Sequence, residues 1–137
     1  MITAKVHGGA ALTMKLKALQ AEVKSALKEA SLAGAEPIHD EAERLAPRRK
    51  TVTKIGHLAD HIEIEVAKST ATSCLVRIGP DKDHWYGRFS ETGTVKMAAK
   101  PYLRPAIDTQ GDEALEAFSK EMRARLKIGP SVRSLRA

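Results

Sequence analysis

The sequence predicts an α+β fold in which a long kinked N-terminal helix and a C-terminal helix pack on a small antiparallel sheet. Apolar residues first recur at steps of three and four, then alternate with polar residues in two short runs, and finally recur at helical spacing again. Helices on one face of an antiparallel sheet are typical of this class. The expected order is β-α-β-β-β-α, in one domain over residues 1–127 that is followed by a flexible basic tail over 128–137.

The first half of the chain predicts a short strand followed by a long helix. Apolar and polar residues alternate over 2–7, as in a strand with one exposed face. The helical pattern then continues to residues 46–47, where Pro47 disfavours a further turn. Pro37 has no backbone N–H, so the helix is expected to kink or restart there. The expected apolar stripe of this helix is Leu12, Leu16, Leu19, Val23, Ala26, Ala30 and Ala33.

The second half predicts a hairpin, a third strand and a closing helix. Residues 62–66 and 74–78 alternate between apolar and polar, and the polar segment between them suits a turn, so the two runs are expected to pair antiparallel. The segment after Phe89 is expected to lead into a third strand. Pro105 suits the first turn of a helix, because an N–H at that position has no helical partner. The expected inner face of this helix is Ile107, Leu115, Phe118, Met122 and Leu126.

The composition is that of an ordinary globular domain of 137 residues, with 42% hydrophobic and 29% charged residues. Aromatic residues make up only 4%, so the core is expected to be aliphatic. Cys74 is the single cysteine and cannot form an internal disulfide. We see no apolar stretch long enough to span a membrane and no signal-peptide layout at residues 1–9, which favours a protein kept in a cytoplasm without membrane contact.

The net charge of +6 is concentrated most sharply in Arg48, Arg49, Lys50 and Lys54. These residues fall in a segment, 47–57, that has no apolar period and is expected to be an exposed loop. Such a cluster can contact phosphate groups without reading a sequence, or it can simply be solvated. Both interpretations remain open, and no DNA-reading motif accompanies the cluster.

A metal site is weighed at His57, Asp60 and His61, because two histidines four residues apart on a helix can share an ion. This segment is expected to enter a strand, in which residues four apart are too widely separated. We therefore expect surface histidines and no metal-binding residue.

No arrangement of nucleophile, acid and base predicts an enzyme. Cys74 is expected to be a small core residue, with His84 the nearest basic candidate in the sequence. Glu91 and Asp108 have no defined separation, which an acid/base pair of carboxylates requires. Nucleophile elbows and phosphate-binding glycine loops are absent from the sequence. We expect no catalytic residue and no cofactor, and a small hydrolase is the least favoured function.

Trp85, Tyr86 and Phe89 bring three of the five aromatic residues together. Outside a clear strand, such a group fits either a core or a subunit interface, since aromatic residues are enriched at both. Gly93, which lies between two threonines, is expected to take a positive φ in a tight turn.

Two sequence boxes resemble a known family, the neck and tail-completion proteins of long-tailed bacteriophages, or gp-ten-like minor virion proteins. The first box contains Tyr86, Phe89, Glu91, Gly93 and Thr94 and is similar to the family's Tyr-Ala-x-x-x-Glu-x-Gly-Thr. The second contains Pro101, Tyr102, Leu103, Arg104 and Pro105 and is similar to Pro-Phe-Leu-Arg-Pro-Ala. Gly87 stands where the family usually has alanine. The resemblance covers roughly residues 2–127.

The resemblance implies a virion structural protein that is made in the host cytoplasm and forms a ring in the neck, around the channel for genomic DNA. The implied partners are further copies of the chain and the portal-side, neck and tail-tube proteins. The 47–57 loop would then face the channel or an adjoining ring, and the two boxes would shape the subunit and its contacts. The alternative from another class is a non-specific nucleic-acid-binding module, which is supported by charge alone.

Overall fold

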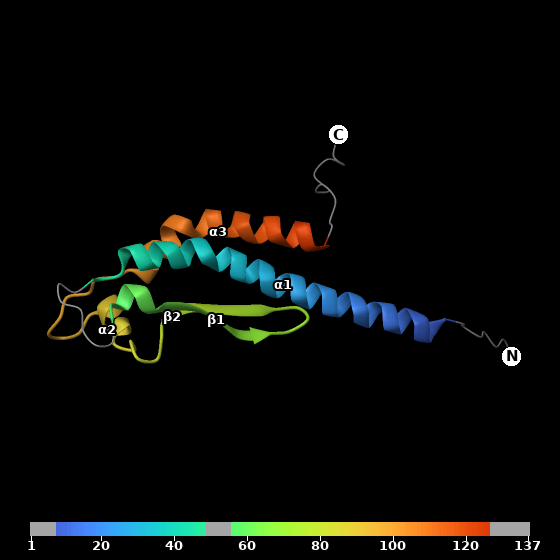
Figure 1. Ribbon diagram of the computed structural model, residues 1–137, viewed down its shortest axis with the longest axis horizontal. Coiled ribbons are helices and arrows are strands. Elements are labelled where there is room, and N and C mark those ends of the chain that lie inside the picture. Colours follow the sequence, from blue (N-terminus) through green and yellow to red (C-terminus); the bar gives the residue numbers. More distant parts are fainter. Residues whose placement is uncertain (1–7, 49–55, 127–137) are drawn as a thin grey trace, which may run out of the picture.

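The computed structural model describes residues 8–48 and 56–126 and confirms the α+β class (Figure 1). The strand expected over 2–7 and the tail expected over 128–137 lie outside the described residues. In order, the elements are α1 (Gly9–Leu45), the 3-10 helix η1 (Leu58–His61), β1 (Ile62–Ser69), β2 (Cys74–Pro80), α2 (Gly87–Thr92) and α3 (Leu103–Leu126).

α1 runs without interruption through Pro37, and its axis bends in its C-terminal third (Figure 1). The kink was therefore expected correctly. The helix ends at Leu45, as predicted, because Ala46 is already extended before Pro47. Every residue of its N-terminal part, 9–22, is exposed, and this part projects past the rest of the subunit. Within the described ranges, no helix combines the length and apolarity needed to cross a membrane.

The hairpin was predicted correctly in partners and direction. β1 and β2 pair antiparallel, with Ile62 opposite Pro80 and Val66 opposite Val76, and a bulge follows Val66. Side chains alternate between partly buried and exposed along both strands. The inner side chains face α1, which lies between the hairpin and α3 (Figure 1).

The third strand was predicted wrongly for the part of the chain that the structure describes. The sheet has two strands, and the segment after the aromatic residues forms α2 and then a tight turn with a single bridge between Thr94 and Met97. The reason is local. Gly93 takes φ 77° and reverses the chain directly after α2, which leaves no extended run to pair with the hairpin.

The inner face of α3 also differs from the prediction. Ile107 and Leu115 are 54% and 64% exposed, whereas Ala106 and Ala114 are buried. The helices approach through small residues: a Cβ added at Gly34 of α1 would lie 3.0 Å from the Ala114 carbonyl oxygen. Phe118, a predicted inner residue, does face Gly34, with its Cβ 3.2 Å from that position, so the prediction is confirmed there. Ile107 and Leu115 lie on the outside of the pair. The buried core cluster is Ala42, Ala46, Leu58, Ala59, Ile62, Tyr102 and Ala106.

The helix contact predicts opposite effects for two glycine substitutions. Gly34→Leu must push α3 away, and we expect it to lower the free energy of unfolding by about 1–3 kcal/mol. Gly111→Leu is the matched control, because a Cβ there meets nothing within 4 Å. Since leucine favours a helix more than glycine does, this control is expected to raise the free energy of unfolding by up to about 1 kcal/mol. Urea titrations followed by circular dichroism measure both, and equal effects would contradict the contact.

Candidate functional site

The two sequence boxes meet at the N-terminus of α3. The Glu91 carboxylate, from α2, accepts hydrogen bonds from the backbone N–H groups of Tyr102, Leu103 and Arg104 at 2.7, 2.9 and 3.1 Å. The first N–H groups of a helix have no partner within the helix, so Glu91 serves as its cap from eleven residues away. The boxes are thus one structural unit, joined by the Glu91 carboxylate.

The electrostatics of this cap favour an ionised glutamate. Burial alone would raise the pKa of Glu91, but the three backbone N–H groups and the nearby Arg104 guanidinium outweigh it and lower that pKa below its usual value. The positive end of the α3 dipole acts in the same direction. The carboxylate is therefore a fixed negative charge at neutral pH.

Glycines allow the close packing around the cap. A Cβ at Gly87 would lie 2.7 Å from Leu58 Cδ1 and 3.0 Å from the Tyr102 hydroxyl, so an alanine there would require the neighbours to move. Tyr102 itself is fully buried, and burial raises its pKa to about 12. At Gly93 the positive φ confirms the predicted turn, and an added Cβ would lie 2.9 Å from the Ala99 nitrogen.

The aromatic group is split between the core and the surface. Tyr86 packs against the core cluster, whereas Trp85 is 58% exposed. Trp85 and Phe89 meet edge to face with centroids 5.5 Å apart, and the Arg88 guanidinium lies over both rings. This arrangement holds an exposed Trp85 in a defined position, as an interface residue would be held.

Of the predicted basic cluster, the structure describes only Arg48. Its guanidinium lies 3.7 Å from the Asp60 carboxylate, and both side chains are at least half exposed, so the ion pair contributes little. Arg48 borders a groove of about 500 Å³ that is also lined by Phe89, Met97 and Lys100. Arg49, Lys50 and Lys54 lie outside the described residues.

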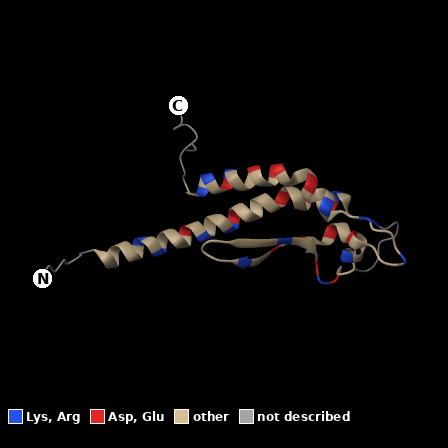
Figure 2. Ribbon diagram, turned by 180° about the vertical axis from the view of Figure 1, so that it is seen from behind, with Lys and Arg blue, Asp and Glu red and all other residues tan. Residues whose placement is uncertain are grey.

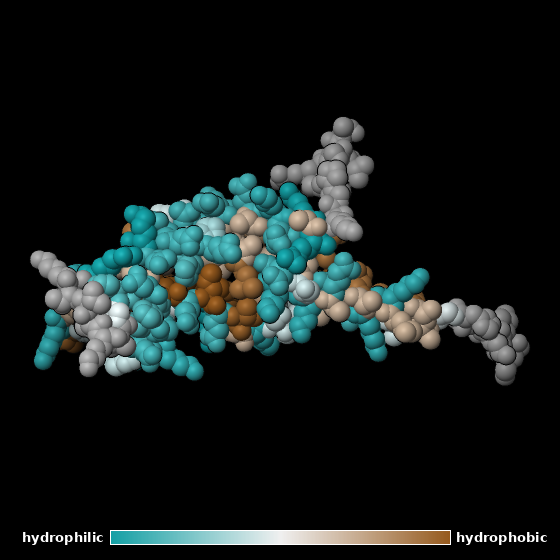
Figure 3. Space-filling model, in the orientation of Figure 1, coloured by the Kyte–Doolittle hydropathy of each residue, from teal (hydrophilic) through white to brown (hydrophobic). Residues whose placement is uncertain are grey.

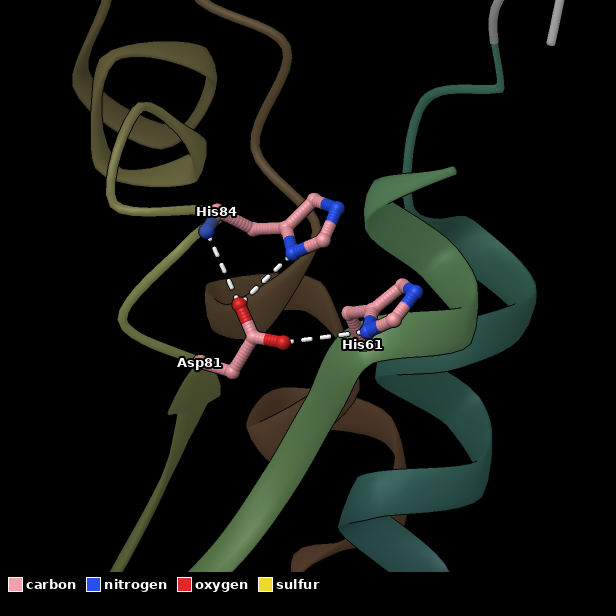
Figure 4. Close-up of side chains that lie close together, drawn as sticks. All are labelled: His61, Asp81 and His84. Carbon is pink, nitrogen blue, oxygen red and sulfur yellow. Dashed lines mark hydrogen bonds and ion pairs between the residues drawn. The ribbon is translucent and has the colours of Figure 1, made fainter. Parts of the chain in front are cut away.

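The histidines are grouped differently from the sequence expectation. His61 ends the 3-10 helix η1, and its ring pairs with Asp81 rather than with Asp60 or His57 (Figure 4). His84 bonds the same Asp81 carboxylate. Sequence reasoning missed Asp81. The sequence did offer a signal, the three-residue spacing from Asp81 to His84. An aspartate side chain often accepts a hydrogen bond from a nearby backbone N–H, and Asp81 accepts one from His84 at 2.8 Å.

The cap predicts an acid-sensitive contribution to stability. Glu91→Gln removes the charge and points an amide N–H₂ at backbone donors, and we expect a loss of about 1–3 kcal/mol at neutral pH. Because the folded pKa of Glu91 is lowered from 4.5, the contribution is present above pH 4.5 and is lost as pH falls through the folded value.

Denaturant titrations at several pH values measure this contribution. The exposed Glu113→Gln on α3 is the matched control and should have little effect at any pH. A destabilisation by Glu91→Gln that stays constant down to low pH would contradict the role of the ionised carboxylate.

Comparison with known proteins agrees with the resemblance carried by the first box. The model of the HK97 gp10-like family, described as "Bacteriophage HK97-gp10, putative tail-component", matches residues 10–93. No curated protein and no solved structure matches the chain significantly. The match covers more than half of the sequence, from the start of α1 to the turn after α2. The chain therefore belongs to the HK97 gp10-like family of bacteriophage tail components.

Proposed function

We propose that this chain is a structural virion protein that forms a ring in the phage neck and joins the DNA-filled head to the tail. Its role is then to bind neighbouring copies and the portal-side, neck and tail-tube proteins, and not to catalyse a reaction. The observation that carries the proposal is the exposed apolar stripe on the projecting part of α1, residues 9–23, which we call the arm.

The arm has an apolar stripe with no partner within the described part of the subunit. Leu12, Leu16 and Leu19 lie on one helix face and are 59%, 52% and 53% exposed. An isolated helix of this length is only marginally stable in water, and most helical stability comes from packing an apolar face. The arm therefore calls for a partner surface.

That surface belongs to another molecule, because the arm cannot fold back. α1 is one continuous helix, and its middle part is fixed by packing against α3 and the hairpin. The arm is a straight extension of this fixed segment and points away from the body (Figure 1). It can reach the body of a second copy but not its own.

The body offers an apolar surface that suits the arm. A shallow groove crosses α1 at Gly34 and is bordered by Ile38, by Val76 and Ile78 of β2, and by Phe118 of α3. Figure 3 shows apolar side chains gathered in the middle of the body, beside the helix pair. The groove has a volume of about 310 Å³, and its lining offers apolar contacts to leucine side chains.

Charge supports the same pairing. Three lysines, Lys15, Lys17 and Lys24, lie in the outer half of α1, whereas the first half of α3 is acidic (Figure 2). The acidic residues of α3 are Asp108, Asp112, Glu113, Glu116 and Glu121, of which Glu121 pairs with Arg125. An arm seated in the groove of a neighbour would bring the lysines near these carboxylates, and such complementarity favours the correct orientation.

The arm and the groove are different surfaces of one chain, so copies of the chain can join head to tail. Head-to-tail contacts generate a closed ring when the rotation between neighbours closes and an open filament when it does not. A closed ring supplies the channel that a neck requires for DNA. The basic residues Arg48, Arg49, Lys50 and Lys54 are our candidates for lining that channel or meeting an adjoining ring.

The arm predicts a change in oligomeric state. The triple variant Leu12→Ser, Leu16→Ser, Leu19→Ser removes the stripe, and we expect it to be monomeric at concentrations where the unmodified chain assembles. Light scattering coupled to size-exclusion chromatography, together with native mass spectrometry, measures the mass. The core lies elsewhere, so the melting of the body should be preserved.

A control replaces apolar residues that lie outside the arm, one about as exposed as the arm leucines and one more exposed. Leu75→Ser with Val95→Ser should leave the mass of the assembly unchanged. Assembly by the arm variant, or a wild-type chain that stays monomeric at high concentration, would count against the proposal. Cryo-electron microscopy of the neck in purified virions then tests the location and the ring.

A further inference from the structure

Three side chains from two segments, the end of η1 and the turn after β2, converge at the open end of the hairpin (Figure 4). His61 Nδ1 lies 3.0 Å from Asp81 Oδ2, and His84 Nδ1 lies 2.6 Å from Asp81 Oδ1. The two imidazole rings stack with centroids 4.1 Å apart and planes inclined by 16°. A single carboxylate is thus shared between two nearly parallel histidines.

The backbone holds these residues in place. The Asp81 N–H donates to the His61 carbonyl oxygen at 3.0 Å, and the His84 N–H donates to both the carbonyl and a carboxylate oxygen of Asp81. Side chains that are carried on a fixed backbone lose little conformational entropy when they bind an ion. The cluster is therefore preorganised.

The donor set has the chemistry of a transition-metal site. Two imidazole nitrogens and a carboxylate oxygen are ligands for Zn²⁺ and similar ions, whereas Mg²⁺ prefers oxygen alone. Ligand atoms around a tetrahedral Zn²⁺ lie about 3.3 Å apart, given bonds of about 2.0 Å. Here one ligand atom from each residue lies within 4.8 Å of the others, and at least one imidazole ring must turn out of the stack for both Nδ1 atoms to point at one ion.

Asp81 offers a carboxylate oxygen toward each histidine, Oδ2 toward His61 and Oδ1 toward His84. Coordination at Nδ1 requires each histidine to carry its proton on Nε2, which neutral imidazole permits.

The two histidines differ in exposure, as is required in a metal site that an ion can enter from solvent. His84 is 1% exposed, whereas the His61 side chain is 40% exposed. An ion can approach from the His61 side and reach a shielded donor, leaving a fourth position for water. His39, Asp40 and Glu43 also lie close together, but that group has one histidine and an 80% exposed Asp40.

We propose that His61, Asp81 and His84 bind a divalent transition-metal ion of the Zn²⁺ class. The ion would join the end of η1 to the turn that leads into α2, the helix that carries Glu91 and Phe89. It would act as a structural clip on the side of the subunit that holds the exposed Trp85. This site goes beyond the proposed assembly role and does not depend on it.

The test uses the full chain without a histidine tag, treated with EDTA and dialysed. Titration with ZnCl₂ in a calorimeter should show one ion per chain, and Zn²⁺ but not Mg²⁺ should raise the melting temperature. CoCl₂ should give the intense visible absorption of a low-coordinate site. Asp81→Asn and His61→Ala should each weaken Zn²⁺ binding by at least about tenfold.

The matched control is His39→Ala, which removes a histidine from the other group and should bind Zn²⁺ like the unmodified chain. If Asp81→Asn does not fold without metal, His61→Ala decides, because its side chain is partly exposed. No zinc uptake by the unmodified chain, or equal weakening by His39→Ala and His61→Ala, would overturn the proposal.

Discussion

The close contact between α1 and α3 is the constraint on which the rest of the structure depends. Gly34 lies so near the Ala114 carbonyl oxygen and Phe118 Cβ that no side chain fits at position 34. The core is rich in alanine, and each buried alanine contributes less apolar area than a leucine would. Several large aliphatic side chains are left at the surface, on the arm and on the outer side of α3. A subunit arranged in this way has much of its hydrophobic area available for neighbours.

The cap formed by Glu91 is the second interaction that shapes the subunit, and it explains why the two sequence boxes occur together. The cap holds the start of α3 against α2, so the position of α3 on α1 is fixed at one end by the cap and along its length by the small-residue contact. Gly87 and Gly93 are needed because the chain approaches itself too closely for a Cβ. These residues therefore support the shape of the subunit, while Trp85 and Arg88 nearby are exposed and available for contacts.

Periodicity and turn chemistry predicted the elements whose cause is local. The hairpin, the end of α1 before Pro47 and the start of α3 near Pro105 all follow from short-range rules. The apolar period of a helix does not show whether its apolar stripe packs within the subunit or stays exposed. Leu12 and Leu16 have the same helical spacing as the buried Ala26 and Ala30, yet they extend beyond the body. For Ile107 and Leu115, the deciding factor was the distance between two helices, which no single segment encodes. The bond between Asp81 and His61 joins residues twenty positions apart and is likewise a property of the folded chain.

The continuity of α1 connects these features to assembly. One rigid helix carries both the arm and the floor of the groove, so the angle between the donating and accepting surfaces is set within the subunit and not by a hinge. Binding in the proposed assembly would then order few additional residues. Less conformational entropy would be lost, so more of the free energy gained from apolar burial would contribute to affinity. In the proposed assembly, the same rigidity would fix the rotation from one copy to the next, which is the quantity that decides between a ring and a filament. The packing of α3 on α1, through Gly34 and Ala114, would then control the geometry of that assembly as well as the stability of the subunit.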